Sequence, residues 1–162
     1  MIKNLTLESM DFRDLNRQQV GTYAEHYVKM ALTKHGISVF TAEVDDRGVD
    51  FVARTVTNGK VHHYDIQVKS IRYSTSYIFI PEAKFRVAEN FILAIVIFDD
   101  TGDHPSLYLI PSTSWSKPSP LLTFKDYESR NLKSKNEYGL NLSKRNMELM
   151  NLFRLEDIIK TM

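Results

Sequence analysis

The sequence predicts one α/β domain in which helices flank a central mixed β-sheet. Three observations support this fold class: a helical pattern of apolar residues that begins near residue 15, a hairpin pattern around residue 58, and an unbroken apolar run over residues 91–98. These patterns have the periods and lengths of a helix, two antiparallel strands and a buried central strand. The chain of 162 residues also has the usual size of one compact domain.

The first expected element is a helix over residues 15–35, followed by a short strand over residues 37–40. Gly36 stands where helix C-caps favour glycine, and a polar turn is expected over residues 45–48. The helix is predicted from apolar residues that recur at helical spacing: Val20, Ala24, Tyr27, Val28 and Ala31.

A β-hairpin is expected next, formed by strands over residues 49–55 and 61–70. The dipeptide Asn58-Gly59 lies between them, and Asn-Gly is favoured in tight hairpin turns because both positions adopt positive φ angles. The two strands should therefore pair antiparallel.

The second half of the chain alternates strands with connections. Strands are predicted over residues 77–80, 91–98, 106–110 and 138–142, and short helices over residues 82–88 and 155–160. A Ser/Pro-rich connection over residues 111–120 is no domain linker, since too little chain follows it to form a second core. We therefore expect a single domain over residues 1–162, with a core over about 15–110 and a C-terminal extension over 111–162.

Composition excludes several classes of protein. The absence of cysteine excludes disulfide frameworks and thiolate zinc sites. No apolar stretch approaches the roughly 18 residues of a membrane span, and the N-terminus has no secretory signal pattern, so a cytoplasmic protein without a membrane partner is expected. The net charge of +1 gives no overall attraction to nucleic acids. Residues 125–145 carry six basic and three acidic residues. This local excess could contact nucleic acid, but it is more typical of a solvated surface loop.

Four polar residues are placed where a site for chemistry would form. Strand alternation puts Gln67 and Lys69 on one face, and hairpin pairing would bring Asp50 to that face. Glu25 lies on the N-terminal helix, one turn after Gly21, whose missing side chain would let the helix approach the sheet closely. These four side chains are therefore expected to converge.

Such a set suits a divalent cation, because Mg²⁺ prefers oxygen ligands. Carboxylates would come from Glu25 and Asp50, and neutral oxygens from the Gln67 side chain and the Val68 backbone carbonyl. The cation, Mg²⁺ or Mn²⁺, would lower the pKa of a water molecule and neutralise charge on a phosphate. Lys69 would orient the water or stabilise the transition state. The pattern favours phosphodiester hydrolysis.

The three motifs, taken in order, resemble those of the PD-(D/E)XK nuclease superfamily, which includes restriction endonucleases and archaeal Holliday-junction resolvases. The motifs are Gly21-Thr-Tyr-Ala-Glu25, Gly48-Val-Asp50-Phe-Val and Asp65-Ile-Gln67-Val-Lys69-Ser70. Each motif is short, and their order, spacing and secondary structure together carry the resemblance. It covers roughly residues 15–110 and implies a restriction-endonuclease-like core and a metal-dependent endonuclease that acts on DNA. It also implies a homodimer, since many nucleases of this fold pair to cut both strands.

The sequence departs from the superfamily pattern at Gln67, where an acidic residue is usual. Similar subfamilies of restriction nucleases that cut modified DNA also carry glutamine there, so the change does not by itself imply inactivity. The amide removes one negative charge, and hard cations are held mainly by carboxylate charge. One bound metal ion is therefore expected.

The same residues also allow other interpretations. Glu25 and Lys29 have the spacing of a surface ion pair, and Gln67 and Lys69 could form the wet face of a half-buried strand. A catalytically inactive nuclease-fold module that binds nucleic acid or a protein partner would have the same fold. A nuclease acting on RNA would have the same site. Candidate contacts with phosphates or bases are Arg47, Arg72 and Tyr73.

Overall fold

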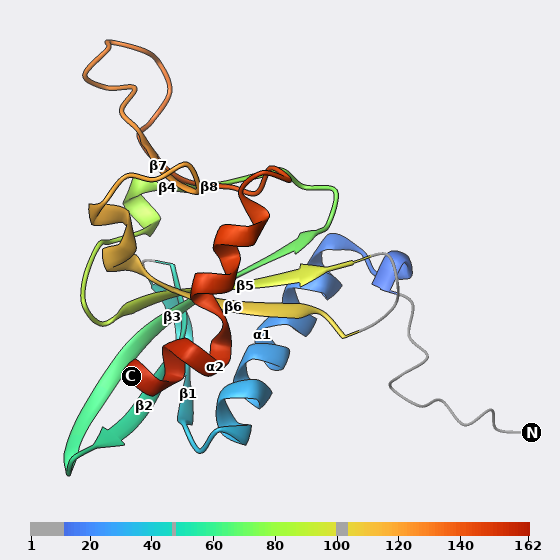
Figure 1. Cartoon of the computed structure of the whole chain (residues 1–162), viewed down its shortest axis with the longest axis vertical. Coiled ribbons are helices and arrows are strands. Elements are labelled where there is room, and N and C mark those ends of the chain that lie inside the picture. The colour runs from blue at the N-terminus through green and yellow to red at the C-terminus, as the bar shows by residue number, and fades with distance from the viewer. Residues whose placement is uncertain (1–11, 47, 100–103) are drawn as a thin grey trace, which may run out of the picture.

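The computed structural model describes residues 12–46, 48–99 and 104–162, apart from the side chains of residues 42–46 (Figure 1). The elements follow one another as η2 (Phe12–Asp14), α1 (Arg17–Lys34), β1 (Ser38–Asp46), β2 (Val49–Thr57), β3 (Lys60–Arg72), β4 (Tyr77–Pro81), η3 (Glu82–Lys84), β5 (Phe91–Phe98), β6 (Ser106–Pro111), η4 (Ser112–Ser116), β7 (Leu122–Lys125), β8 (Glu137–Asn141), η5 (Met147–Phe153), α2 (Leu155–Ile158) and η6 (Ile159–Thr161). Within these ranges, no helix combines the length and apolar composition that crossing a membrane requires.

A five-stranded sheet forms the centre of the fold, with strand order β1-β2-β3-β5-β6. β3 and β5 are parallel, and the other neighbouring strands are antiparallel. All eight residues of β5 are buried, as expected for a central strand covered on both faces. The predicted α/β class with a central mixed sheet flanked by helices is confirmed.

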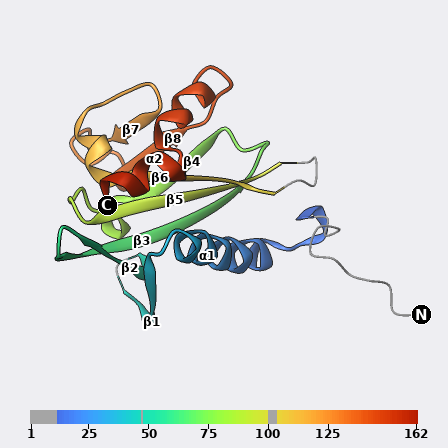
Figure 2. The same cartoon turned by 60° about the horizontal axis from the view of Figure 1, so that its bottom comes forward.

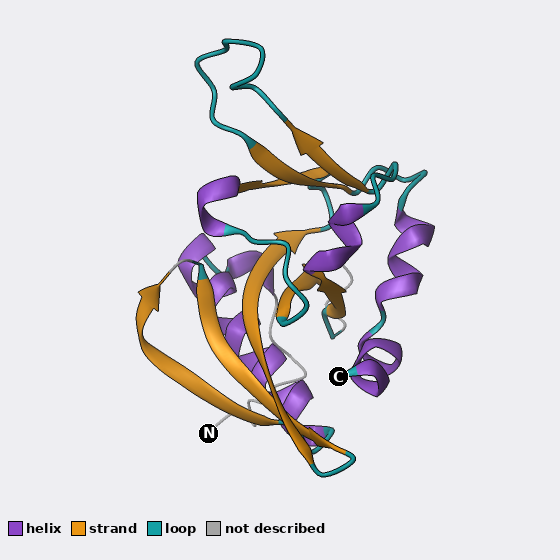
Figure 3. Cartoon of the chain, turned by 90° about the vertical axis from the view of Figure 1, so that its left-hand side faces the viewer, coloured by secondary structure: helices purple, strands orange, loops and turns teal. Residues whose placement is uncertain are grey.

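Two hydrophobic clusters cover the two faces of this sheet. One cluster joins α1 and α2 to alternate residues of β5, among them Ile92 and Val96. The other joins the intervening residues, among them Leu93 and Ile95, to a smaller sheet of order β4-β8-β7 and to η4 and η5. Figure 2 shows α1 running along the large sheet, and Figure 3 shows the smaller sheet above it.

The N-terminal helix is confirmed. Asn16 and Gln19 form a reciprocal capping box, in which each side chain accepts a hydrogen bond from the other residue's backbone N–H, at 2.9 and 2.8 Å. The buried stripe recurs every four residues and packs against the sheet: Val20, Ala24, Val28 and Leu32. The hairpin is also as predicted, with positive φ at Asn58 and Gly59.

Two sequence predictions about elements need correction, and one strand was not predicted. β1 continues to Asp46, which pairs with Val49 after a β-bulge, so the turn is shorter than expected. The four-residue strand β7 has no counterpart among the predicted strands. The expected helix over residues 82–88 is one turn of 3₁₀ helix, Glu82–Lys84. The single-domain organisation stays a prediction, although β4 and β8 pair across the expected core and extension.

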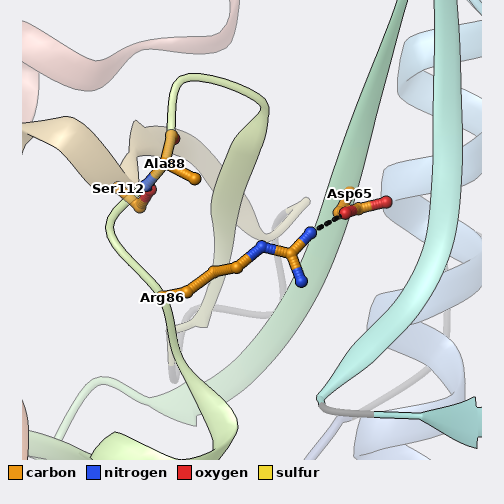
Figure 4. A network of polar contacts seen from close by, with 4 residues as sticks. All are labelled: Asp65, Arg86, Ala88 and Ser112. Carbon is orange, nitrogen blue, oxygen red and sulfur yellow. Dashed lines mark hydrogen bonds and ion pairs between the residues drawn. The ribbon is translucent and has the colours of Figure 1, made fainter.

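The segment after η3 does not continue as a helix, because its backbone forms hydrogen bonds with the Ser112 side chain. The buried Ser112 Oγ accepts a hydrogen bond from the Ala88 N–H and donates one to the Ala88 carbonyl, each 2.9 Å long. Nearby, the Arg86 guanidinium forms an ion pair with Asp65 (Figure 4) and lies 5.2 Å from the centre of the Phe91 ring. These contacts fix residues 82–90 beside β3.

We expect Ser112→Ala to lower the free energy of unfolding by about 2 kcal/mol, because it leaves two backbone groups without their buried partner. Urea denaturation would measure the change. Ser116→Ala is the matched control at an exposed serine of the same 3₁₀ helix, η4, where a change of at most about 0.5 kcal/mol is expected. Equal effects of the two variants would contradict the role assigned to the Ser112 hydroxyl.

Candidate functional site

The candidate site lies where β2 separates from β3. Their pairing ends at Phe51 and Ile66, whereas β3 continues alongside β5 as far as Arg72. Asp50 lies at the start of this gap, where its Oδ2 accepts a hydrogen bond of 2.6 Å from the Val68 N–H. The N–H and C=O of one strand residue point toward the same neighbouring strand. The Val68 carbonyl therefore faces the same gap as the Asp50 carboxylate.

Gln67 is buried next to this contact, with 3% of its surface exposed. Its Nε2 donates a hydrogen bond of 3.2 Å to the Lys84 carbonyl oxygen. Its Oε1 is also buried, and no described group donates a hydrogen bond to it. A buried acceptor without a partner costs about 1–3 kcal/mol, so such atoms are rare, and a bound water molecule, ion or ligand can supply the missing partner. Gln67 Oε1 is therefore suited to bind a cation or a hydrogen-bond donor.

Gly48 holds the turn against the Gln67 amide. Its φ angle is +79°, and a Cβ placed on it would lie 2.5 Å from both Gln67 Nε2 and the Lys84 carbonyl oxygen. Only glycine tolerates both the backbone conformation and this close approach. Gly48, two residues before Asp50, therefore helps to hold the Gln67 side chain in position.

A cavity of about 610 Å³ lies between the beginning of α1 and the end of β3; we call it the α1–β3 cavity. Its lining includes Gly21 on α1 and the neighbours Val68 and Lys69 on β3. A Cβ added to Gly21 would meet no atom within 4 Å. The prediction that Gly21 allows a close approach of the helix to the sheet is therefore wrong. Its missing side chain leaves space in the cavity.

Glu25 is half-buried on α1, one turn after Gly21 and one turn before Lys29. The Lys29 ammonium donates to Thr41 Oγ1 at 3.1 Å and lies 5.3 Å from the centre of the Phe51 ring, and no ion pair joins it to Glu25. Helix residues four apart lie on one side. Glu25 is therefore located between the α1–β3 cavity and the β2 residue that follows Asp50.

The predicted catalytic and metal-binding residues thus fall into two groups. Asp50 and Val68 are in contact, and Gln67 and Lys69 are the residues on either side of Val68. Glu25 lies on the helix that borders them. In the part of the chain that the structure describes, three or more His, Asp or Glu side chains do not gather into a metal centre. Among the described residues, the carboxylates nearest to this group are those of Asp50 and Glu25, so a cation held by described residues would also need neutral oxygens.

The three residues predicted to contact nucleic acid differ in where they lie. Arg47 lies outside the described residues. Arg72 lines the α1–β3 cavity and donates a hydrogen bond of 2.8 Å to the Leu15 carbonyl oxygen, and the Tyr73 side chain is 57% exposed. Arg17, a cavity residue one turn before Gly21, was not among the predicted contacts. Its four-residue spacing from Gly21 was the available signal.

No family model and no curated protein matches the chain. Among solved structures, the chain is similar to Hjc, a Holliday junction resolvase from the archaeal hyperthermophile Archaeoglobus fulgidus. The two are 12% identical with a TM-score of 0.44, and the match covers 75% of this chain and 83% of that chain. A function for the site must therefore be argued from its own residues.

Proposed function

We propose that this protein is a Mg²⁺-dependent endonuclease that hydrolyses phosphodiester bonds in DNA. The observation that carries the proposal is the Asp50 carboxylate, held by the Val68 N–H in the gap beside β3. The buried Gln67 Oε1, which accepts from no described donor, belongs to the neighbouring residue. A carboxylate, an amide oxygen and a backbone carbonyl are the ligand types that hard divalent cations prefer.

The donor set fits one divalent cation, Mg²⁺ or Mn²⁺. We assign Asp50 and Glu25 as the charged ligands, and Gln67 Oε1 and the Val68 carbonyl oxygen as the neutral ligands. The amide at position 67 limits the negative charge to two carboxylates, which favours one cation over two. When bound, the cation supplies positive charge to the scissile phosphate and lowers the pKa of a nearby water molecule.

The protein's own residues orient the reaction. The hydrogen bond from Val68 fixes the Asp50 carboxylate before substrate arrives, so little free energy is spent on ordering it. Lys69 is the next residue along β3 and lines the α1–β3 cavity. Its ammonium would donate hydrogen bonds to the attacking water or to the phosphate oxygens, where charge develops. DNA is proposed as the substrate because the motif order resembles that of DNA nucleases.

A cleavage panel tests this function. Linear, nicked, branched and single-stranded DNA, and RNA, would be incubated with Mg²⁺, Mn²⁺ or EDTA. We expect at least one DNA to be cut only when metal is present, and Lys69→Ala to slow the cutting by about 10²–10³-fold, as for other transition-state donors. Lys34→Ala, an exposed lysine in the last turn of α1, is the matched control.

The panel also has outcomes that contradict the proposal. Cleavage of RNA alone would reassign the site to an RNA nuclease. No cleavage by the wild type with either metal ion would favour an inactive nuclease-fold module that binds nucleic acid or a protein. Equal cleavage by the wild type and Lys69→Ala would locate the activity elsewhere.

A further inference from the structure

The residues that line the α1–β3 cavity have an unusual balance of charge. Among the described lining residues, three are cationic and none is acidic: Arg17, Lys69 and Arg72. Three more carry hydroxyl groups: Ser70, Ser74 and Thr75. In the described part of the chain, none of the three cations forms an ion pair. Cations that have no acidic partner among the described residues, beside hydroxyl donors, form an environment that attracts anions.

Arg72 is already oriented for such a ligand. One guanidinium nitrogen donates to the Leu15 carbonyl oxygen at 2.8 Å, which anchors the side chain across the end of the cavity. A guanidinium carries five N–H donors, so this single bond leaves others to serve a phosphate. An arginine that is held in place loses less side-chain entropy when it binds.

The cavity continues directly from the candidate site. It begins at Val68, whose N–H binds Asp50, and extends past Arg72 to Thr75. Lys69 and Arg72, three residues apart on β3, both line it. The cavity volume of about 610 Å³ lies in the range of ligand-binding pockets. A DNA strand that crosses Asp50 would therefore continue over the cations.

We propose that the α1–β3 cavity binds backbone phosphates of DNA on one side of the scissile bond, with Arg17 and Arg72 as the principal contacts. The inference takes its ligand, DNA, from the proposed function. Because the contacts come from arginine side chains, the binding requires no metal ion. Arg17 is an exposed residue of the first turn of α1, so its side chain is available to substrate and carries little of the packing.

Fluorescence anisotropy of labelled DNA in EDTA, measured at several salt concentrations, tests the proposal without catalysis. We expect Arg17→Ala to weaken binding about tenfold, the loss of one charge-assisted contact, and to lower the slope of log K against log salt by about 0.9. Lys34→Ala removes a lysine about 25 Å away on the same helix and should stay within about twofold of the wild type. Arg72→Lys keeps the charge and should weaken binding less than Arg17→Ala.

The outcomes separate this inference from the nuclease proposal. If the wild type binds DNA, Arg17→Ala lowers the affinity and slope, and no DNA is ever cut, the cavity keeps its assignment and the nuclease function is wrong. If DNA is cut with metal but Arg17→Ala binds with wild-type affinity and slope, the cavity assignment is wrong. Failure of the wild type to bind DNA in EDTA also overturns it. Circular dichroism would verify that each variant is folded.

Discussion

Replacing Asp50 with asparagine is expected to lower the rate of DNA cleavage by about 10³-fold or more, with little loss of folded structure. Asparagine keeps a side-chain oxygen that can accept the hydrogen bond from the Val68 N–H, so the local geometry is retained. It removes the negative charge that would hold a hard cation in the gap between β2 and β3. Activity and stability should therefore respond very differently to this one change.

Single-turnover cleavage at saturating Mg²⁺ would measure the Asp50→Asn rate, and thermal unfolding would measure its stability. The matched control is Asp157→Asn, which removes an exposed carboxylate on α2 that pairs with Lys160 at 3.1 Å. This surface pair is worth at most about 1 kcal/mol, and its loss should leave cleavage unchanged. A wild-type rate for Asp50→Asn would exclude the carboxylate from the reaction.

Gly48→Ala is expected to lower the free energy of unfolding by about 3 kcal/mol, the largest stability effect predicted for this protein. The left-handed backbone costs an alanine about 1–2 kcal/mol. The added Cβ would also approach the Lys84 carbonyl oxygen and Gln67 Nε2 to 2.5 Å, and relieving such overpacking costs about 1–3 kcal/mol. Because Lys84 contributes a backbone atom, the turn itself must move.

The hairpin provides a matched control for this prediction. Gly59 has a similar φ of +74°, but a Cβ added there would meet no atom within 4 Å. Gly59→Ala should therefore show only the backbone cost, and the difference between the variants in urea denaturation isolates the steric contact. Equal losses would contradict the tight packing at Gly48. Displacement of Gln67 in Gly48→Ala should also slow cleavage, whereas Gly59→Ala should cleave as the wild type does.

Local sequence patterns were sufficient to predict the elements whose conformation is set by residues within the element itself. The spacing of Val20, Ala24 and Val28 is the period of one helix face, and Asn58-Gly59 has the backbone preferences of a tight turn. The apolar run of β5 is long enough for a strand covered on both sides. In each case the signal and the structure span the same few residues.

Elements that depend on distant residues were harder to predict. The four residues of β7 form a strand because β8 pairs with them, and residues 85–88 leave the helical path because Ser112 binds the Ala88 backbone. Neither partner is adjacent in sequence. Short segments take their conformation from tertiary context more than from propensity, because few local contacts favour one state.

The sequence by itself determined the central hairpin, the N-terminal helix and the order of the polar residues Glu25, Asp50, Gln67 and Lys69 along them. Only the tertiary structure decided where β2 separates from β3, how Gln67 is buried against Lys84, and that a cationic cavity with Arg17 opens beside Val68. The physical reason is the distance along the chain over which each kind of interaction acts. Periodicity and turn preference act within a few residues, whereas the end of a strand pairing and the shape of a cavity depend on contacts between segments far apart in the chain.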